Sequence, residues 1–576
     1  MERYTSCSVV LDLYDVKAKD EVSYKVSNAQ PFSLNVIPKE AKPINKVATL
    51  ERDYFLLDGS FALYDDLKSP YVAYMSNDYI ATIEVTSPKA ISSVGLTFRF
   101  WEMLPNKIVL TFYDQNNRVL SSGVFTPRNG DYRVVNKEVR EYIYFAECNV
   151  DEYYRVTIKL ESKDRYIRIN TIEYGAEITY GDNSSKKIKS CSIVEQADIL
   201  SSELPISESS LEVIDNENLF EITNPKSYYK YLQKRQKFKI YETIDDEEFL
   251  VATHYLKEWS QTKKLLASFK LQDVIGLLDE TVFYGGIYKD YKVSSLIDEI
   301  LSPFGITYIL DKELQDITLS GYLPIASSRD SLKQVAFACG ATVRTTKSDG
   351  IAIFKPNLET IGIIDTDRKL ISKAHEIAQK DLITGVKIIA HDYGLESEIK
   401  ELYRGEFESG TYTITFDEPC KAISFEGATL ISSYPNYAVI KANGGEVLIK
   451  GQKYNDHKTE YSYSPNTMNA TDINDVRIDN ATLISKNNAL KRAREIYEIK
   501  QYRLEHTLKI INNEEEVAKM YAVRVNDSYA PLLIRKSSTD LAGGYISTIE
   551  GLGYALRTLD DYRAGDELYT GGIGII

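Results

Sequence analysis

Alternation of apolar and polar residues over short segments is the feature of this sequence that most constrains its fold. The pattern recurs along much of the chain, between turn residues such as Asn129-Gly130. A period of two places the apolar side chains on one face of a β-strand. Clear examples are ATIEV (81–85), VGLTFRF (94–100), KIVLTFYD (107–114) and YYRVTIKL (153–160). The chain is therefore expected to be mainly β.

A few segments instead have the period of an amphipathic helix. In SLIDEILSPF (295–304), four apolar residues share one face, and Ser294 or Ser295 is expected to cap the helix. A second helix is expected from Arg329 to Cys339, with Gly340 as its C-terminal cap. The segment 485–503 has the strongest helical pattern in the chain. The pair Asp349-Gly350 is expected to turn a hairpin.

The order of these segments divides the chain into domains. We expect a multidomain protein, mainly β with one α+β part, in which two β-rich blocks bracket the α+β domain. The expected parts are an N-terminal segment with a β-sandwich (1–185), a first β-domain (186–285), a small α+β domain (286–356), a second β-domain (357–408 and 480–576) and a small β-domain inserted in it (409–479).

Composition excludes several classes of protein. With 84 acidic against 69 basic residues, the net charge of −15 disfavours a general nucleic-acid-binding surface. The five cysteines are far apart and include no CxxC motif, which indicates free thiols in a reducing cytoplasm. No apolar run approaches the roughly 20 residues of a membrane span. The 43 tyrosines suit sheets and subunit contacts, although an AT-rich genome would produce the same bias.

Motifs for catalysis, metal binding and phosphate binding are not found. There are five histidines and no HExxH, GxSxG or GxxxxGK[ST] pattern. The glycine pairs near 551 and 571 lie outside any strand–helix turn, and Asp365 with Asp367 is better explained as a helix cap than as a catalytic pair. We therefore expect a protein that is not an enzyme and that needs no cofactor or metal.

From residue 189 onward, an ordered set of segments resembles the hub proteins at the distal end of phage tails. This family includes the central baseplate hub of contractile tails and the N-terminal part of tail-associated proteins in long non-contractile tails. The segments are KRQKFKIYE, FLVATHYL, FKLQDVIGLLD (269–279), VSSLIDEILSPFGITY, GYLPIASSRDSLKQVAFACGATVRTTKSDGIAIF (321–354), NNALKRAREIYEIKQYR and TDLAGGYISTIEGLGY (539–554). The resemblance implies that both β-domains are tail-tube-like β-barrels.

The first 185 residues resemble an accessory module of such proteins from phages and prophages of Gram-positive hosts, with a galactose-binding-type jelly roll. The segments that carry this resemblance include TLERDYFLLDGSF (49–61), YVAYMSNDY (71–79) and RYIRINTIEYG (165–175). Met75 stands where a tryptophan is common in that module, which removes one sugar-stacking ring. The candidate saccharide contacts are Tyr71, Tyr74 and Trp101, and core packing is the alternative for each.

The resemblance implies a homotrimer in the virion, at the tail tip or baseplate, made in the host cytoplasm. Two tube-like domains in each of three chains would match the pseudo-sixfold tail tube. The implied partners are the tail tube protein, distal tail and baseplate proteins, the tape measure protein and the genomic DNA that passes through the channel. Two other functions remain open: a receptor-binding tail protein that holds host cell-wall carbohydrate, and a tail-associated enzyme that degrades the cell wall.

Overall fold

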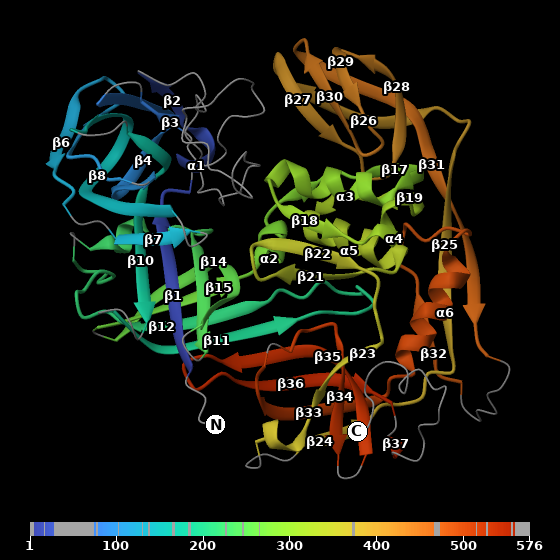
Figure 1. The fold of residues 1–576 in the computed structure, drawn as a ribbon. Coiled ribbons are helices and arrows are strands. Elements are labelled where there is room, and N and C mark those ends of the chain that lie inside the picture. The colour runs from blue at the N-terminus through green and yellow to red at the C-terminus, as the bar shows by residue number, and fades with distance from the viewer. Residues whose placement is uncertain are drawn as a thin grey trace, which may run out of the picture.

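The protein is described by a computed structural model (Figure 1). It describes residues 5–16, 18–27, 74–76, 79–101, 103–128, 131–135, 139–163, 167–181, 186–224, 227–244, 247–263, 265–370, 375–465, 473–513, 515–525, 528–554 and 557–558. Strands predominate throughout these residues, and they form several separate sheets. The prediction of a multidomain, mainly β protein is confirmed.

One 14-stranded sheet joins segments from both ends of the chain. Along its main path the order is β10-β1-β13-β14-β15-β12-β11-β35-β36-β33-β24; β34 and β37 pair with β35 off this path, and β23 pairs with β34. We call the strands from β10 to β11 the first block and the remaining strands the second block. The strands of the first block are β1 (Thr5–Tyr14), β10 (Gly175–Gly181), β11 (Lys187–Gln196), β12 (Glu208–Ile214), β13 (Lys237–Ile244), β14 (Glu247–Lys263) and β15 (Leu266–Gln272). Those of the second block are β23 (Thr360–Ile364), β24 (Glu376–Gln379), β33 (Leu504–Ile511), β34 (Met520–Val525), β35 (Ser528–Asp540), β36 (Ile546–Gly553) and β37 (Arg557–Thr558).

Each block encloses a core of its own. The first-block core contains Val9, Phe238 and Phe269, and the second-block core contains Leu508, Val523 and Ile549. In both blocks the period-two pattern of the strands turns one side chain inward and the next outward.

The N-terminal β-domain is an eight-stranded sheet of order β3-β9-β4-β8-β5-β6, in which β2 pairs with β4 and β7 pairs with β8. Its longest pair, β4 with β8, shifts register several times between Thr86 and Gly95, which bends both strands around one core. Within the expected segment 1–185, however, β1 and β10 lie in the first block and flank this domain. The strands are β2 (Ser23–Val26), β3 (Tyr74–Met75), β4 (Ile80–Trp101), β5 (Lys107–Tyr113), β6 (Val119–Phe125), β7 (Asp131–Val135), β8 (Val139–Glu161) and β9 (Arg168–Glu173), and the short helix α1 spans Ala18–Glu21.

The α+β domain contains two of the predicted helices, and the third packs beside it. Helix α5 spans Ser328–Cys339, and Gly340 ends it in a left-handed conformation, as expected. Helix α3 spans Val293–Leu301, but the predicted serine cap is wrong, because Lys292 is the N-cap and makes no side-chain cap bond. Strand β17 runs directly into α3, and the carbonyl of Ile317 accepts the Val293 N–H, so no serine is needed there. Helix α6 spans Ala489–Lys500 and buries Ala489, Ala493, Ile496 and Tyr497.

The remaining elements of this central region are short. Their bounds are α2 (Val274–Leu278), β16 (Val282–Phe283), β17 (Gly286–Lys292), β18 (Thr307–Leu310), α4 (Lys312–Gln315), β19 (Thr318–Leu323), β20 (Ala326–Ser327), β21 (Thr342–Thr346) and β22 (Gly350–Phe354). The predicted hairpin at Asp349-Gly350 is confirmed, since Thr346 pairs with Gly350 in the β21–β22 ladder.

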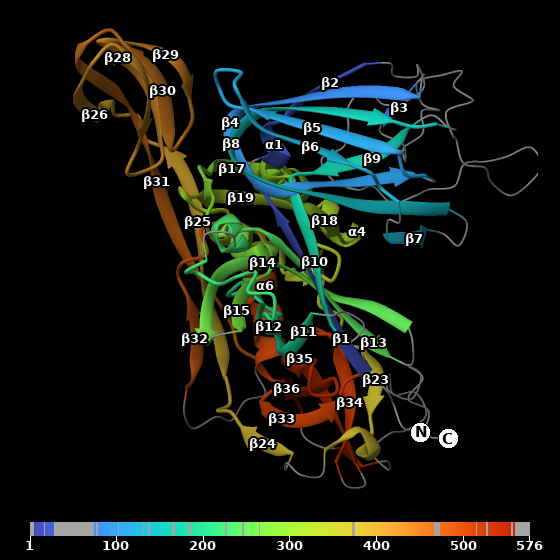
Figure 2. The ribbon, with the colours of Figure 1, turned by 90° about the vertical axis from the view of Figure 1, so that its left-hand side faces the viewer.

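The inserted domain has its own core and stands apart from the N-terminal β-domain in both views (Figure 1, Figure 2). Its ladders begin before residue 409, because the 19-residue strand β31 pairs with β25, β26 and β28 in turn. The strands are β25 (Gly385–Leu395), β26 (Lys400–Phe407), β27 (Gly410–Thr415), β28 (Cys420–Glu426), β29 (Ala428–Ser433), β30 (Tyr437–Ala442), β31 (Gly445–Tyr463) and β32 (Asp475–Ile478). Within the described ranges, no helix is long and apolar enough to cross a membrane.

Gly175 tests the junction between the N-terminal β-domain and the first block. Its φ is +150°, and a Cβ there would lie 1.9 Å from the carbonyl oxygen of Leu13. Because both groups belong to the backbone, neither can move away cheaply. We expect Gly175→Ala to destabilise the β1–β10 pair by roughly 2–4 kcal/mol. Urea unfolding measures the loss of stability, and hydrogen exchange of β1 and β10 shows whether these two strands are affected.

Gly444→Ala is the matched control. Gly444 also has a positive φ, +96°, but the nearest atom to its Cβ position is 3.9 Å away. Gly444→Ala should lower the free energy of unfolding by only about 1–2 kcal/mol, because a non-glycine residue is penalised by that amount in the left-handed conformation. Equal losses in the two variants would contradict the predicted clash at Gly175.

Candidate assembly surface

The outward side of the large sheet forms one polar face that spans both blocks. It runs over β14, β15, β12, β11, β35, β36, β33 and β24, and every pair of neighbours in this series is antiparallel. In β12, β33 and β36 inward residues are buried and outward residues are exposed or half-buried, whereas all four residues of β24 are exposed. We call the outward side the common face.

Cross-strand register places the outward residues in rows. One row consists of Glu258, Lys270, Ser210, Ser192 and Asp540, in that order across β14, β15, β12, β11 and β35. All five are exposed. A row that continues from the first block into the second without a break makes the common face a single surface.

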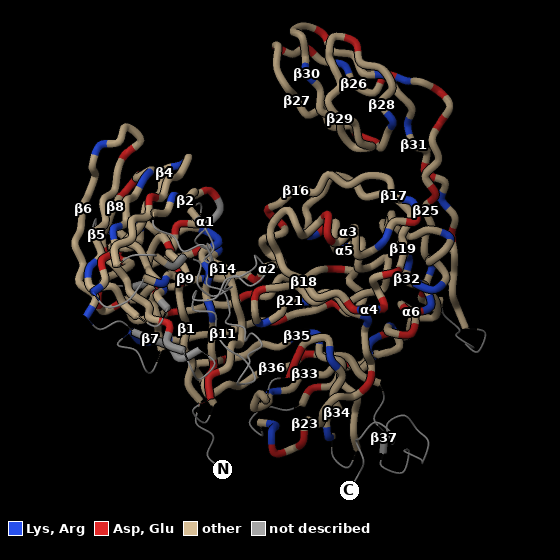
Figure 3. Tube along the Cα trace, turned by 45° about the horizontal axis from the view of Figure 1, so that its top comes forward, with Lys and Arg blue, Asp and Glu red and all other residues tan. Residues whose placement is uncertain are grey.

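Ion pairs across this face neutralise much of its charge. Five lysines each lie within 3 Å of a glutamate: Lys257–Glu208 at 2.9 Å, Lys270–Glu258 at 2.9 Å, Lys189–Glu212 at 2.7 Å, Lys536–Glu550 at 2.8 Å and Lys380–Glu505 at 2.5 Å. Such exposed pairs contribute little to stability, about 0–1 kcal/mol each. Their effect is on the surface potential. Acidic and basic residues are likewise interspersed along the chain (Figure 3).

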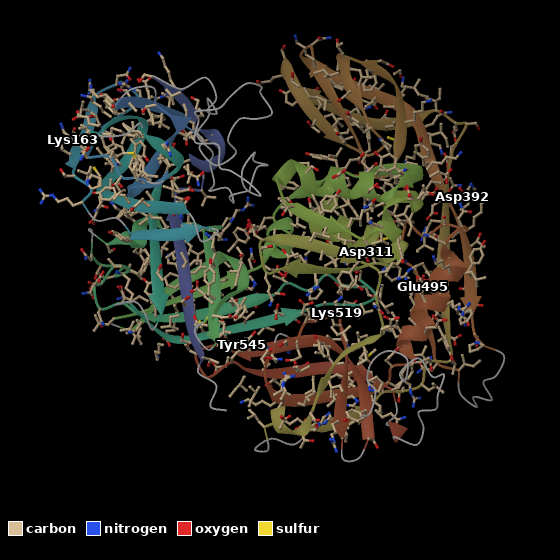
Figure 4. The ribbon with its side chains drawn as sticks, in the orientation of Figure 1. Lys163, Asp311, Asp392, Glu495, Lys519 and Tyr545 are labelled. Carbon is tan, nitrogen blue, oxygen red and sulfur yellow. The ribbon has the colours of Figure 1, made fainter. Side chains whose placement is uncertain are left out.

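The seam between the blocks is the pairing of β11 with β35, which runs from Ser192 opposite Asp540 to Gln196 opposite Lys536. Packing reinforces it, because the turn between β35 and β36 places Leu541 and Tyr545 in the core of the first block. Tyr545 is labelled at this junction in Figure 4. Two blocks that are far apart in sequence are thus held together by backbone pairing and by a shared core.

A polar cavity of about 470 Å³, including its open mouth, lies where both blocks meet the α+β domain. Glu195 and Glu516 line it from the two blocks, and Arg344 of the α+β domain contacts Glu516 at 2.7 Å. Burial raises the pKa of the Glu195 carboxyl, and the nearby Lys347 and Arg344 lower it to a smaller extent. This cavity lies at the seam, and its ion pair ties the α+β domain to the second block.

Both ends of the common face are open strand edges. Strand β13 pairs with β14 only as far as Tyr255, and the backbone of Leu256 bonds residues 235 and 236. From Lys257 to Lys263, β14 pairs with β15 alone among the described strands. At the other end, β24 pairs with β33 alone. An unpaired edge of this kind is a template for pairing with another chain.

Large apolar side chains are exposed beside each edge. Near the β14 edge they are Leu265, 37% exposed, and Ile222, 50% exposed, whose backbone N–H donates to the Gln261 side chain. Near the β24 edge they are Ile377 at 39% and Leu382 at 36%. Exposed apolar groups beside an open edge are typical of a protein contact surface.

The described residues hold no cluster of three or more histidine, cysteine or carboxylate side chains that could bind a metal. The hydroxyl of Ser209 lies 2.6 Å from Nδ1 of His254, a contact also found in hydrolases, but both residues are buried in the first block. Burial lowers the pKa of His254 to about 4. The pair therefore satisfies two polar groups inside the first block.

The described side chains leave the prediction of saccharide contacts at Tyr71, Tyr74 and Trp101 untested. Tyr71 lies outside the described residues. Tyr74 is in β3 and Trp101 ends β4, and only their backbones are described. No motif in the sequence marks the seam or the edge strands as functional. Alternation in β11 and β35 predicted strands there, but no local signal indicates which distant strand each one pairs with.

Comparison with known proteins gives similarity at the level of structure only. No protein-family description and no curated protein sequence matches the chain. Its structure is similar to a tail protein from Neisseria meningitidis MC58, with 10% identity, coverage of 66% of this chain and 93% of that chain, and a TM-score of 0.40. It is also similar to the 43 kDa tail protein of prophage MuSo2 from Shewanella oneidensis, with 11% identity, coverage of 65% of this chain and 94% of that chain, and a TM-score of 0.37. A third similar structure is a prophage tail protein from Listeria monocytogenes EGD-e, with 10% identity, coverage of 67% of this chain and 93% of that chain, and a TM-score of 0.38.

A pair of cysteines tests the seam. Directly opposite residues in an antiparallel ladder have Cα atoms about 4.5–5.5 Å apart, within the range of a disulfide. We therefore expect Ser192→Cys with Asp540→Cys to form an intrachain disulfide, detected by peptide mapping under non-reducing conditions. The control is Ser210→Cys with Asp540→Cys, because β12 lies two strands from β35, about 9.6 Å away. Equal oxidation of both pairs would mean that the blocks are not joined in this register.

Proposed function

We propose that this chain is a structural hub of a phage or phage-derived tail. Three copies would form a ring that adapts the tail tube to the tail tip or baseplate, with the common face as the channel wall. The observation that carries the proposal is the continuous common face, which ends in two open edges. The sequence resemblance to tail hub proteins supports it independently.

Strand direction supports closure of a ring. Seven antiparallel steps separate β14 from β24, so these two strands run in opposite directions. A β24 edge can therefore pair with the β14 edge of the next copy and continue the antiparallel order. The two edges are different surfaces, so the contact is head-to-tail, and it gives a closed ring when the rotation per copy closes.

The exposed apolar residues support the same contact. Ile222 and Leu265 beside one edge, and Ile377 and Leu382 beside the other, would be covered when the edges of two copies meet. Burial of apolar area supplies a free energy of about 25 cal/mol per Å². Backbone pairing would add hydrogen bonds and fix the register.

The ion pairs on the common face suit a wall along which DNA slides. A wall rich in unpaired lysine would bind phosphates and hold the genome, whereas strong acidity would repel it. Here lysines and glutamates alternate across neighbouring strands and compensate each other. The proposed wall is thus nearly neutral, and serine and threonine fill the positions between the charges.

The remaining parts are proposed to make contacts within the particle. The N-terminal β-domain and the inserted domain lie outside the large sheet. There they can contact distal tail or baseplate proteins. The tube protein and the tape measure protein would contact the ring itself. We propose that the chain acts without catalysis, in the virion. Carbohydrate binding by the N-terminal β-domain is the second candidate, carried by its sequence resemblance.

The native mass tests the ring. Mass photometry over a range of concentrations should show a species near three times 65.4 kDa, about 196 kDa. A chain that stays monomeric, both alone and with tail tube protein, would contradict the proposal.

Ile377→Asp tests the β24 edge. A buried, unpaired carboxylate at the joint would cost several kcal/mol, so we expect the trimer to dissociate to monomers. Ile309→Asp is the control, because Ile309 is 67% exposed on β18 and lies away from both edges. That variant should keep the mass of the unmodified chain. Trimers of equal stability in both variants would exclude β24 from the interface.

A further inference from the structure

Two histidines attach β24 to the rest of the second block. His375 directly precedes β24, and His506 lies on β33, opposite Ile377. Nε2 of His375 is 3.0 Å from Nδ1 of His506. On the other side of His375, Nζ of Lys369 is 3.4 Å from Nδ1 and also donates to the carbonyl of Arg524.

The lysine fixes the direction of this chain of hydrogen bonds. An ammonium group can only donate, so Nδ1 of His375 must accept, and its proton must be on Nε2. That Nε2–H then donates to Nδ1 of His506, which places the second proton on Nε2 of His506. This last N–H is buried and has no partner. Both hydrogen bonds, from Lys369 to His375 and from His375 to His506, form only when the two imidazoles are neutral.

The surroundings oppose a positive charge on either ring. Burial and the charge of Lys369 lower the pKa of both histidines to about 4, and the imidazole of His506 also contributes to lowering the pKa of His375. The other charged groups near Lys369 are Asp365 and Arg524, whose closest atoms are 3.6 Å apart. In the register of β24 with β33, Glu376 and the Lys380–Glu505 ion pair lie on the side of these strands opposite to His506, on the common face.

The sign of the pH effect follows from these values. The histidines titrate near pH 4 in the folded protein and near 6.5 when released. Their contribution to stability is therefore fully present above pH 6.5 and is lost as the pH falls from 6.5 towards 4. Acid thus favours release of β24.

We propose that Lys369, His375 and His506 form an acid-sensitive latch that holds β24 in place and, with it, the joint between copies. This inference rests on the proposed ring, because β24 is one of its two edges. Protonation of either imidazole adds a second cation beside Lys369 and breaks the chain of donors. Strand β24 then separates from β33, and the ring opens at that joint.

The test uses the full chain, with native mass measured at pH 7.5, 5.5 and 4.5. We expect the trimer at pH 7.5 and a shift to smaller species below pH 6. At pH 5.5, protonation of one histidine on release of β24 should shift the equilibrium between attached and released β24 about tenfold towards release. His375→Gln keeps a hydrogen-bonding amide near Nε2 and leaves His506 as the one titrating imidazole of the latch, so acid should favour release of β24 about tenfold less at pH 5.5 than in the unmodified chain. His457→Gln, at an exposed histidine of β31, is the control and should behave like the unmodified chain.

Hydrogen exchange of residues 375–380, corrected for the intrinsic effect of pH, separates this inference from the proposed ring. If no trimer forms at pH 7.5, the ring is wrong, but the latch still predicts acid-dependent opening of β24, about tenfold weaker at pH 5.5 in His375→Gln than in the unmodified chain. The latch is overturned if β24 stays protected at pH 4.5, or if both proteins open equally.

Discussion

The pairing of β11 with β35 is the interaction on which the rest of the structure depends. It joins a strand near residue 190 to one near residue 540 and converts two β-blocks into one sheet. Without it, each block would have an additional open edge, and the α+β domain between them in sequence would have no fixed platform. The turn that carries Leu541 and Tyr545 strengthens the same joint through the first-block core.

From this joint follow the features that suggest assembly. The part of the large sheet from β14 to β24 is antiparallel along its path and has two faces and two ends. One face covers the cores, and the other is polar, exposed and largely neutral because its charges are paired across strands. The ends are unpaired edges with exposed isoleucine and leucine nearby. A soluble monomer usually protects such edges with charges, proline or a covering element, whereas a ring protects them with its own copies.

The two edges differ in how firmly they are held. The β14 edge is the continuation of a long strand whose first half is paired on both sides. Strand β24 has four residues and a single partner strand among the described residues, and the His375–His506 contact lies beside it. If the proposed ring forms, we expect it to open at β24, since the cost of releasing four residues is smaller than that of disrupting a long strand.

The local structure could be predicted from the sequence alone. Alternation predicted the strands, apolar periodicity predicted α5 and α6, and Gly340 predicted the end of α5, because each depends on residues a few positions apart. The serine cap of α3 could not be predicted, since a distant carbonyl, that of Ile317, satisfies the first N–H of the helix. Tertiary structure alone decided that β1 and β10 join the first block, that β11 pairs with β35, and that β14 and β24 are left open. The physical reason is that a strand's pattern states which face is buried, whereas the identity of its neighbour is set by long-range packing.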